Sequence, residues 1–195
     1  MSGNDRQEGR IGGDRRVRRT RHALRHALVE LVLEKGYDRV TVEDVIARAD
    51  VGRSTFYAHY RDKEDLFLSS FEDEVREAFE RSSGADGGSA SLWLFRHAAE
   101  HADLYRALVK RRGGWALVRR HLEGVLRDLF AQQLAGRADP TDVPLEVVAT
   151  FLADALLGVL TWWMDGDTPV DAEELDRIFH TLSTGGTRDA IGVEL

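Results

Sequence analysis

A short segment around residue 53 carries side chains that suit contacts with nucleic acid. Arg53, Ser54 and Thr55 open a predicted short helix, and Tyr57 and His59 follow within the next turn. An arginine guanidinium can donate two hydrogen bonds to O6 and N7 of guanine, and hydroxyl groups can donate to phosphate oxygens. Threonine can also contact the methyl group of thymine. The segment therefore predicts a surface that reads DNA.

Two predicted helices and the turn between them must position these side chains. Thr41 can cap the first helix, and the turn at Asp50 suits a residue that tolerates unusual backbone angles. The apolar face of this first helix is formed by Val42, Val45, Ile46 and Ala49. In the second helix, Phe56 and Tyr60 are four residues apart and form the buried side. This pattern is typical of a helix-turn-helix whose second helix enters the major groove.

The segment over roughly residues 15–75 resembles the DNA-binding domain of the TetR family of transcriptional regulators. The motifs that carry the resemblance are Gly36-Tyr37, Thr41-Val42, Thr-Phe-Tyr-x-His-Tyr from Thr55 to Tyr60, and Asp-Lys-Glu-x-Leu from Asp62 to Leu66. The resemblance implies an all-α fold, in which a three-helix helix-turn-helix domain is joined by a long helix to a helical ligand-binding and dimerisation domain. Many members have Ser at the position of Gly52 and Gly at the position of Ser54, so the operator sequence is not predicted.

We predict that one set of residues contacts DNA. It consists of Thr41, Arg53, Ser54, Thr55, Tyr57, His59 and Lys63. The resemblance makes Thr41 and Tyr57 phosphate contacts, and His59 could equally be a structural cap. Six arginines, at positions 15, 16, 18, 19, 21 and 25, could form an arm that follows phosphates or enters the minor groove. The alternative is that they form the solvated start of a helix over about residues 16–35.

Charge and composition agree with this organisation. The chain of 195 residues has a net charge of −7, but residues 1–63 carry 14 basic and 10 acidic residues, which gives +4 there and −11 in the remainder. The positive end is attracted to phosphate and the negative end is repelled by it. Cysteine is absent, which fits a reducing cytoplasm. We expect no signal peptide, and no membrane span because Glu146 and Asp154 interrupt the most apolar stretch.

The sequence predicts four regions: a disordered tail over 1–14, the helix-turn-helix domain over 15–62, the helical second domain over 63–184, and a loose tail over 185–195. Predicted helices of the second domain cover residues 63–82, 92–100, 102–111, 115–135, 145–164 and 171–182. Glycine-rich segments at 84–89 and 113–114 predict breaks between them. No strand pattern competes with this interpretation.

Large side chains in the second domain are candidates for an effector site, because ligand sites between helices are mostly apolar with a few polar groups. These candidates are Trp93, His97, Tyr105, Trp115, Leu122 and Trp162. The alternative is that they pack in the core or at an interface. The family resemblance implies that the last two helices pair with their copies in a homodimer. The residues that we assign to that interface are Ala149, Leu152, Ala153, Leu156, Gly158, Leu160, Trp163, Leu175, Ile178 and Leu182.

The sequence thus favours a transcriptional regulator, most simply a repressor, that binds an inverted-repeat operator as a homodimer and is released by a small apolar or amphipathic effector. A second hypothesis is a constitutive DNA-binding module whose second domain only dimerises or docks a protein. A remote alternative is a zinc hydrolase, because His97, Glu100 and His101 match the spacing H-x-x-E-H. No third ligand is signalled, and we expect neither a cofactor nor enzyme activity.

Overall fold

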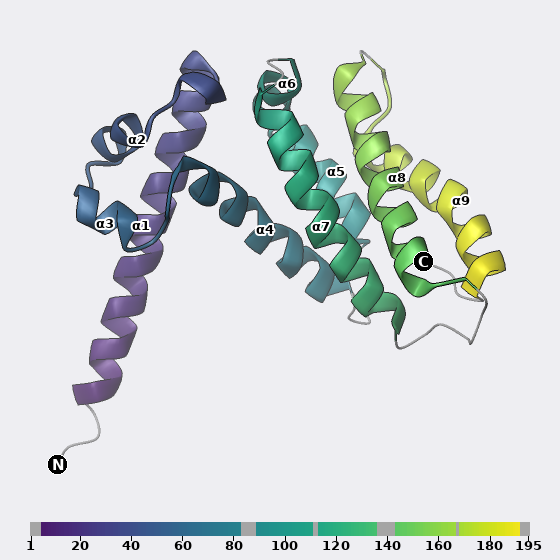
Figure 1. Ribbon diagram of the computed structural model, residues 1–195, viewed down its shortest axis with the longest axis horizontal. Coiled ribbons are helices and arrows are strands. Elements are labelled where there is room, and N and C mark those ends of the chain that lie inside the picture. The colour runs from purple at the N-terminus through teal and green to yellow at the C-terminus, as the bar shows by residue number, and fades with distance from the viewer. Residues whose placement is uncertain (1–4, 83–88, 111–112, 136–142, 167, 192–195) are drawn as a thin grey trace. The chain divides into compact units, whose positions relative to one another are not determined.

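The computed structural model describes residues 5–82, 89–110, 113–135, 143–166 and 168–191. Every regular element in these ranges is a helix, which confirms the predicted all-α fold. The chain divides into two compact units, residues 1–70 and 71–195 (Figure 1). Helix α4 (Lys63–Ser82) starts in the first unit and continues into the second, as the sequence predicted for a long connecting helix.

The first unit is a helix-turn-helix braced by a long helix. It contains α1 (Asp5–Lys35), the short 3-10 helix η1 (Tyr37–Arg39), α2 (Val42–Ala49), α3 (Arg53–Tyr57) and the start of α4. Its core is apolar, and Leu24, Leu28, Val45, Phe56 and Leu66 are almost completely buried. The amphipathic spacing in each helix therefore turns one face of each toward a shared centre.

Local signals in the sequence set the boundaries of these elements. Thr41 and Asp44 form a reciprocal capping box at the start of α2. Gly36 ends α1 with a φ of 81°, a conformation that favours glycine. Asp50 occupies the left-handed region with a φ of 51°, which turns the chain between α2 and α3. Asp62 Oδ1 accepts a hydrogen bond from the Asp65 N–H (2.8 Å) and caps α4.

Helix α1 begins earlier than the sequence predicted. It starts at Asp5 and not near residue 16, so residues 5–14, which we expected to be a disordered tail, are helical. The arginine-rich stretch 15–25 belongs to the same continuous helix, and the side chains at 15, 16, 18, 19 and 21 are exposed. A helix is too wide for the minor groove, so the minor-groove arm does not fit this structure. Phosphate contact by these arginines stays a prediction.

The second unit is a bundle of α5 (Ala90–Glu100), α6 (Ala102–Lys110), α7 (Gly113–Ala135), α8 (Leu145–Asp165) and α9 (Ala172–Ile191), together with the end of α4. Helix α8 lies between α7 and α9, and α5 packs along α9 (Figure 1). The largest departures from the predicted bounds are in α7 and α9. Helix α7 starts at Gly113, where a break was predicted. Helix α9 continues past residue 182 to Ile191, so residues 185–191, which we expected to be a loose tail, are helical. Most of the predicted loop 84–89 lies outside the described residues.

Helix α8 is the most apolar helix of the unit. Its length and mean hydropathy of 1.7 are those of a helix that could cross a membrane, which the sequence interpretation had discounted. Leu152, Leu156 and Leu157 are completely buried against the rest of the unit. Such burial is typical of the core helix of a helical bundle, and an apolar helix of this length needs no membrane to explain it.

Candidate nucleic-acid interface and ligand site

Helix α3 presents its polar side chains outward, as the sequence predicted. Phe56 is completely buried and Tyr60 is 5% exposed, so these two rings anchor the helix in the core. Arg53, Ser54 and Tyr57 are exposed, and Thr55 and His59 are partly exposed. The N-terminal end of the helix, which in helix-turn-helix proteins contacts base edges, therefore carries a guanidinium and two hydroxyl groups.

Two neighbours hold the Arg53 guanidinium in the free protein. Its Nη2 atom lies 3.1 Å from Oε1 of Glu43 on α2, and its Cζ atom lies 5.8 Å from the centre of the Tyr57 ring. Both charged side chains are well exposed, so the ion pair is weak and exchanges readily with another acceptor. Nothing in the sequence marks Glu43 as a partner of Arg53. Glu43 links the two helices of the motif at the predicted reading residue.

The hydrogen-bonding groups of Thr41, a predicted phosphate contact, are already engaged within the protein. Its hydroxyl donates to Oδ2 of Asp44 (2.7 Å) and accepts from the Asp44 N–H (3.1 Å), and its own N–H donates to the same Oδ2 atom (2.8 Å). Lys35 Nζ lies 2.6 Å from this carboxylate, and the bonds from Lys35 and Thr41 hold the pKa of Asp44 well below its usual range. A phosphate would have to compete with Asp44 for the Thr41 hydroxyl.

Lys63 is the predicted DNA contact that the structure places elsewhere. Its ammonium group donates to the backbone carbonyls of Tyr37 (2.9 Å) and Val40 (2.9 Å) and lies 4.2 Å from the centre of the Tyr37 ring. Burial lowers the pKa of Lys63 from its ordinary value. Two of the three ammonium hydrogens are thus used within the protein. This geometry counts against a phosphate contact, and it makes Lys63 a link between the start of α4 and the 37–40 segment.

Four of the predicted effector-site residues come together in the second unit. The rings of Trp93 and His97 stack with centroids 4.9 Å apart, and the centroids of His97 and Tyr105 are 6.1 Å apart. Tyr105 lies 6.4 Å from Trp115 by the same measure. Phe71 of α4 completes this aromatic cluster, at 5.3 Å from His97 and 6.1 Å from Tyr105. The cluster joins α4, α5, α6 and α7 around rings that carry polar atoms.

Two polar groups in the aromatic cluster are removed from water. The Tyr105 side chain is 3% exposed, and its hydroxyl has no hydrogen-bond partner among the described residues. Burial raises the pKa of Tyr105 well above its ordinary value. Burial and the neighbouring His101 lower the pKa of His97 to about 4, so its imidazole is neutral at pH 7. A buried hydroxyl without a partner is rare in folded proteins and marks a place where a ligand atom could bond.

The two remaining effector-site candidates lie outside the aromatic cluster. Leu122 is 1% exposed and belongs to the core along α7. Trp162 is 53% exposed, so its assignment to an internal ligand site does not fit the structure. Its neighbour Trp163 is buried; the indole N–H donates to the Val170 carbonyl (2.8 Å), and the ring lies 6.4 Å from that of Phe95. Trp163, which the sequence assigns to the dimer interface, is therefore held within the second unit.

Most of the residues that we assign to the dimer interface lie in the core of the second unit. Seven of them are buried within the unit itself: Ala149, Leu152, Ala153, Leu156, Leu160, Trp163 and Leu175. The apolar side chains that remain exposed on α8 are Val147 (57%), Phe151 (51%) and Trp162 (53%). Gly158 lies on the same stripe, and no atom would approach a Cβ there within 4 Å. On α9, Leu182 is 69% exposed, and Ile178 is partly exposed.

The fold brings together only two of the three residues that match the zinc-hydrolase spacing. The rings of His97 and His101 have centroids 4.6 Å apart, whereas Glu100 is exposed. Within the described ranges, no group of three His, Cys, Asp or Glu side chains could hold a metal ion. A hydrolytic zinc needs three protein ligands and an open position, which these residues do not supply.

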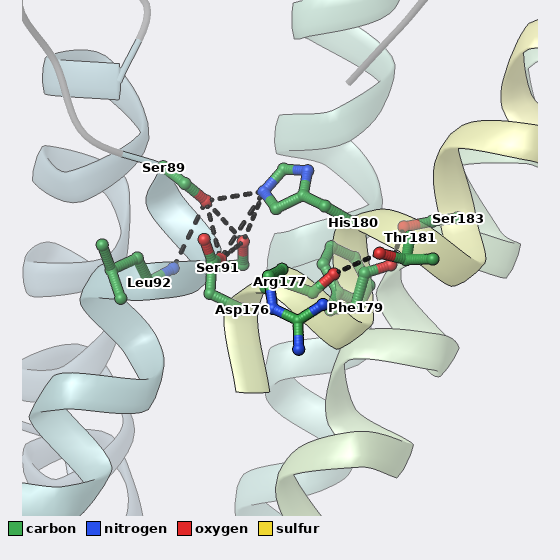
Figure 2. A network of polar contacts seen from close by, with 9 residues as sticks. All are labelled: Ser89, Ser91, Leu92, Asp176, Arg177, Phe179, His180, Thr181 and Ser183. Carbon is green, nitrogen blue, oxygen red and sulfur yellow. Dashed lines mark hydrogen bonds and ion pairs between the residues drawn. The ribbon is translucent and has the colours of Figure 1, made fainter. Parts of the chain in front are cut away.

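A serine, histidine and aspartate cluster joins α5 to α9, and Figure 2 shows it from close by. The Ser89 hydroxyl lies 3.0 Å from both Asp176 Oδ1 and His180 Nε2, and Ser91 donates to the same carboxylate (2.5 Å). In a hydrolytic triad, aspartate and serine contact different nitrogens of the histidine ring. Here the same nitrogen of His180, Nε2, faces both the serine and the aspartate (Asp176 Oδ1 at 3.5 Å). The cluster is therefore a set of polar contacts that connects α5 to α9.

Comparisons with known proteins agree with both units. Residues 24–69 match the model of the bacterial regulatory proteins of the tetR family, and residues 89–185 match that of a transcriptional regulator C-terminal region. The chain is 28% identical over 179 residues to the HTH-type transcriptional regulator TcmR of Streptomyces glaucescens, covering 81% of this chain and 79% of TcmR.

Two solved structures are also similar. A TetR transcriptional regulator from Streptococcus agalactiae superposes with a TM-score of 0.63 and 26% identity, over 89% of this chain and 98% of that one. FadR of Thermus thermophilus, a transcriptional repressor solved in complex with lauroyl-CoA, gives a TM-score of 0.56 and 26% identity, over 85% and 94%.

Proposed function

The chain belongs to the TetR family and is a DNA-binding transcriptional regulator, and from this premise we propose that it represses transcription as an effector-controlled homodimer in the cytoplasm. In this proposal α3 reads an inverted-repeat operator, α8 and α9 join two subunits, and a small molecule bound in the second unit releases the DNA. The observation that carries the proposal is the outward polar end of α3, fixed by two buried aromatic anchors.

Arg53 is the residue that we assign to base recognition. It lies at the first position of α3, its side chain is 64% exposed, and its planar guanidinium can bond guanine at two atoms. Glu43 holds the group in the free protein and must give it up, or orient it, when DNA arrives. The remaining proposed contacts are Thr41, Ser54, Thr55, Tyr57 and His59. Lys63 is left out because its hydrogen bonds are internal.

The homodimer is supported by the exposed apolar stripe on α8. Val147, Phe151, Gly158 and Trp162 recur at intervals of four and seven residues, so they share one helical face. Large exposed apolar groups in one continuous stripe mark a surface that is covered in the functional protein. The small Gly158 lets a second helix approach closely. A two-fold axis there would present two copies of α3 to two half-sites.

The effector site is proposed within the aromatic cluster. The rings of Phe71, His97 and Tyr105 lie close together, and the buried hydroxyl of Tyr105 has no partner in the described structure. Phe71 belongs to α4, whose first residue Lys63 is bonded to the carbonyls of Tyr37 and Val40. A ligand that binds one position of α4 better than the other would shift the helix-turn-helix through this link. The lauroyl-CoA complex of the Thermus thermophilus relative supports an amphipathic effector.

Footprinting on genomic fragments, combined with light scattering of the free protein, tests the proposal. We expect a protected inverted repeat and the mass of two chains. Fragments that show no protected palindrome, or a single chain at working concentration, would refute operator reading by a dimer. The constitutive module is the competing function: there, compounds that stabilise the second unit would leave the affinity for the footprinted operator unchanged in a gel-shift titration.

A further inference from the structure

A second pocket lies away from the aromatic cluster, where the α5–α6 junction meets the end of α8. Its volume is about 420 Å³, within the usual range for small-molecule sites. Ala102 and Arg106 of α6 line one side, and Trp163, Met164 and Thr168 line another. None of the six predicted effector-site residues lines this pocket.

The pocket combines apolar walls with groups that favour a negative charge. Arg106 brings a half-exposed guanidinium whose nearest acidic partner, Asp103, is 3.8 Å away and almost fully exposed, so the pair is weak. Ala102 is the first residue of α6, and the N-terminus of a helix carries a partial positive charge. The Thr168 Oγ1 atom is buried without a hydrogen-bond partner in the described structure. Arg106 and the N-terminus of α6 favour an anionic group, and the Thr168 hydroxyl can donate a hydrogen bond to it.

The apolar wall is held rigidly in place. Because the Trp163 indole N–H donates to the Val170 carbonyl (2.8 Å), its ring plane is fixed, and the indole has no donor left for a ligand. Met164 adds a thioether beside it. An adaptable methionine next to a fixed aromatic ring suits an aliphatic chain or a small ring.

We propose that this pocket is a binding site for a small amphipathic carboxylate, distinct from the effector site proposed above. Arg106 and Thr168 would hold the carboxylate, and the apolar body would lie against Trp163 and Met164. Bound there, the molecule would connect the α5–α6 junction to the segment between α8 and α9.

The sequence offers a site-specific probe of this proposal. The chain has two methionines, Met1 and Met164, so protein labelled with ¹³C at the methionine methyl gives a spectrum that Met164→Leu assigns directly. Octanoate and its neutral isostere octanamide are the ligands to titrate. We expect the Met164 methyl signal to shift saturably, with octanoate bound at least about ten times more tightly than octanamide, because a charged hydrogen-bonded contact distinguishes them.

Variants of the lining residues complete the test. Arg106→Gln should reduce the affinity for octanoate to that for octanamide, and Thr168→Val should weaken octanoate binding about threefold to tenfold at unchanged volume. Arg127→Gln is the matched control, because Arg127 is a half-exposed arginine beside an acidic neighbour on α7, away from the pocket. The control should bind octanoate like the unsubstituted protein.

Three results would overturn the proposal: a Met164 signal that does not move at 10 mM octanoate (roughly the weakest affinity of interest), equal affinities for octanoate and octanamide, or an Arg106→Gln variant that binds as before. Calorimetric binding of octanoate without a Met164 shift would place the ligand elsewhere and equally reject this pocket. All measurements use the free protein, so none of these failures bears on operator recognition or on the aromatic cluster.

Discussion

The two units of this chain differ in the sequence distance over which their polar contacts are made. In the first unit, Thr41 bonds Asp44 three residues away, and Arg48 of α2 bonds Glu34 of α1 at a separation of 14. In the second unit, Ser89 bonds Asp176 across 87 residues. The polar contacts of the DNA-binding unit therefore join segments that are close in the sequence, whereas the second unit depends on how distant helices pair.

The same contrast appears within α8, between neighbouring side chains. Leu152 is completely buried, whereas Phe151, the residue before it, is 51% exposed. Both are strongly apolar, so composition cannot separate the face that packs in the core of the second unit from the face that stays exposed. What distinguishes them is which side of α8 packs against the rest of the unit, and only the folded structure shows this. Substitutions on the two faces should accordingly have different consequences.

Phe151→Asp gives the largest effect that we expect. A carboxylate on each subunit would be buried without a counter-charge in the proposed interface, which should weaken the dimer by about 1000-fold, or ~4 kcal/mol. Analytical ultracentrifugation over a range of protein concentrations measures this change. Ala116→Asp places the same charge at an exposed position of α7 and should leave the dimer intact. A Phe151→Asp protein that remains dimeric would remove the exposed stripe from the interface.

Substitutions at Arg53 should lower operator specificity by about 10-fold to 100-fold, because one bidentate guanine contact discriminates by ~1–3 kcal/mol. Arg53→Lys keeps the charge but loses the planar fork, so preference for the operator should fall while the salt dependence of binding stays nearly unchanged. Arg53→Ala should lose the preference for the operator and leave weak, salt-sensitive binding, because the phosphate contacts of the other residues remain. Competition gel shifts against random DNA at several salt concentrations provide the measurement. If lysine supports full specificity, Arg53 contacts phosphate and not a base.

The contrast between the units also explains which features the sequence could predict. Thr41, Gly36, Asp50 and Asp62 have local conformational preferences, and each marks a boundary where the structure has one. The helices of the second unit followed from periodicity, but their ends shifted where glycine was taken as a break, as at Gly113. A glycine at a helix end is tolerated when tertiary contacts stabilise the helix.

The roles of individual residues were harder to predict where a side chain of one type can lie either inside the protein or at its surface. Lysine at position 63 has the chemistry of a phosphate contact, and only the approach of the Tyr37 and Val40 carbonyls reveals its internal bonds. Trp162 and Trp163 are adjacent residues of the same type, so the sequence does not show which of them is buried and which is exposed. Four residues that the sequence offers as effector-site candidates lie in the aromatic cluster, since large rings in a helical domain tend to pack together. Their contact with an effector stays a prediction.

The neutral imidazole of His97 gives the second unit a dependence on pH. Its pKa of about 4 lies below the ordinary value near 6.5, so the unfolded chain binds a proton that the folded chain excludes. The stability is fully present above pH 6.5 and is lost as the pH falls toward 4. Between pH 7 and pH 5 the loss attributable to His97 should be about 2 kcal/mol. Urea unfolding of the unsubstituted protein and His97→Gln measures it; parallel pH dependences would contradict the assigned burial.

Lys63→Gln should produce the smallest effect on DNA binding. It therefore separates residues that stabilise the first unit from residues that contact DNA. Because the ammonium group bonds two backbone carbonyls, its loss should cost about 1–2 kcal/mol of unfolding free energy. The slope of log affinity against log salt should stay unchanged, whereas losing a true phosphate contact lowers its magnitude by about one. Tyr57→Phe is the companion variant, since the exposed Tyr57 hydroxyl is free to reach a phosphate and its loss should weaken binding at unchanged stability. A reduced salt slope for Lys63→Gln would return Lys63 to the interface and show that its carbonyl bonds give way when DNA binds.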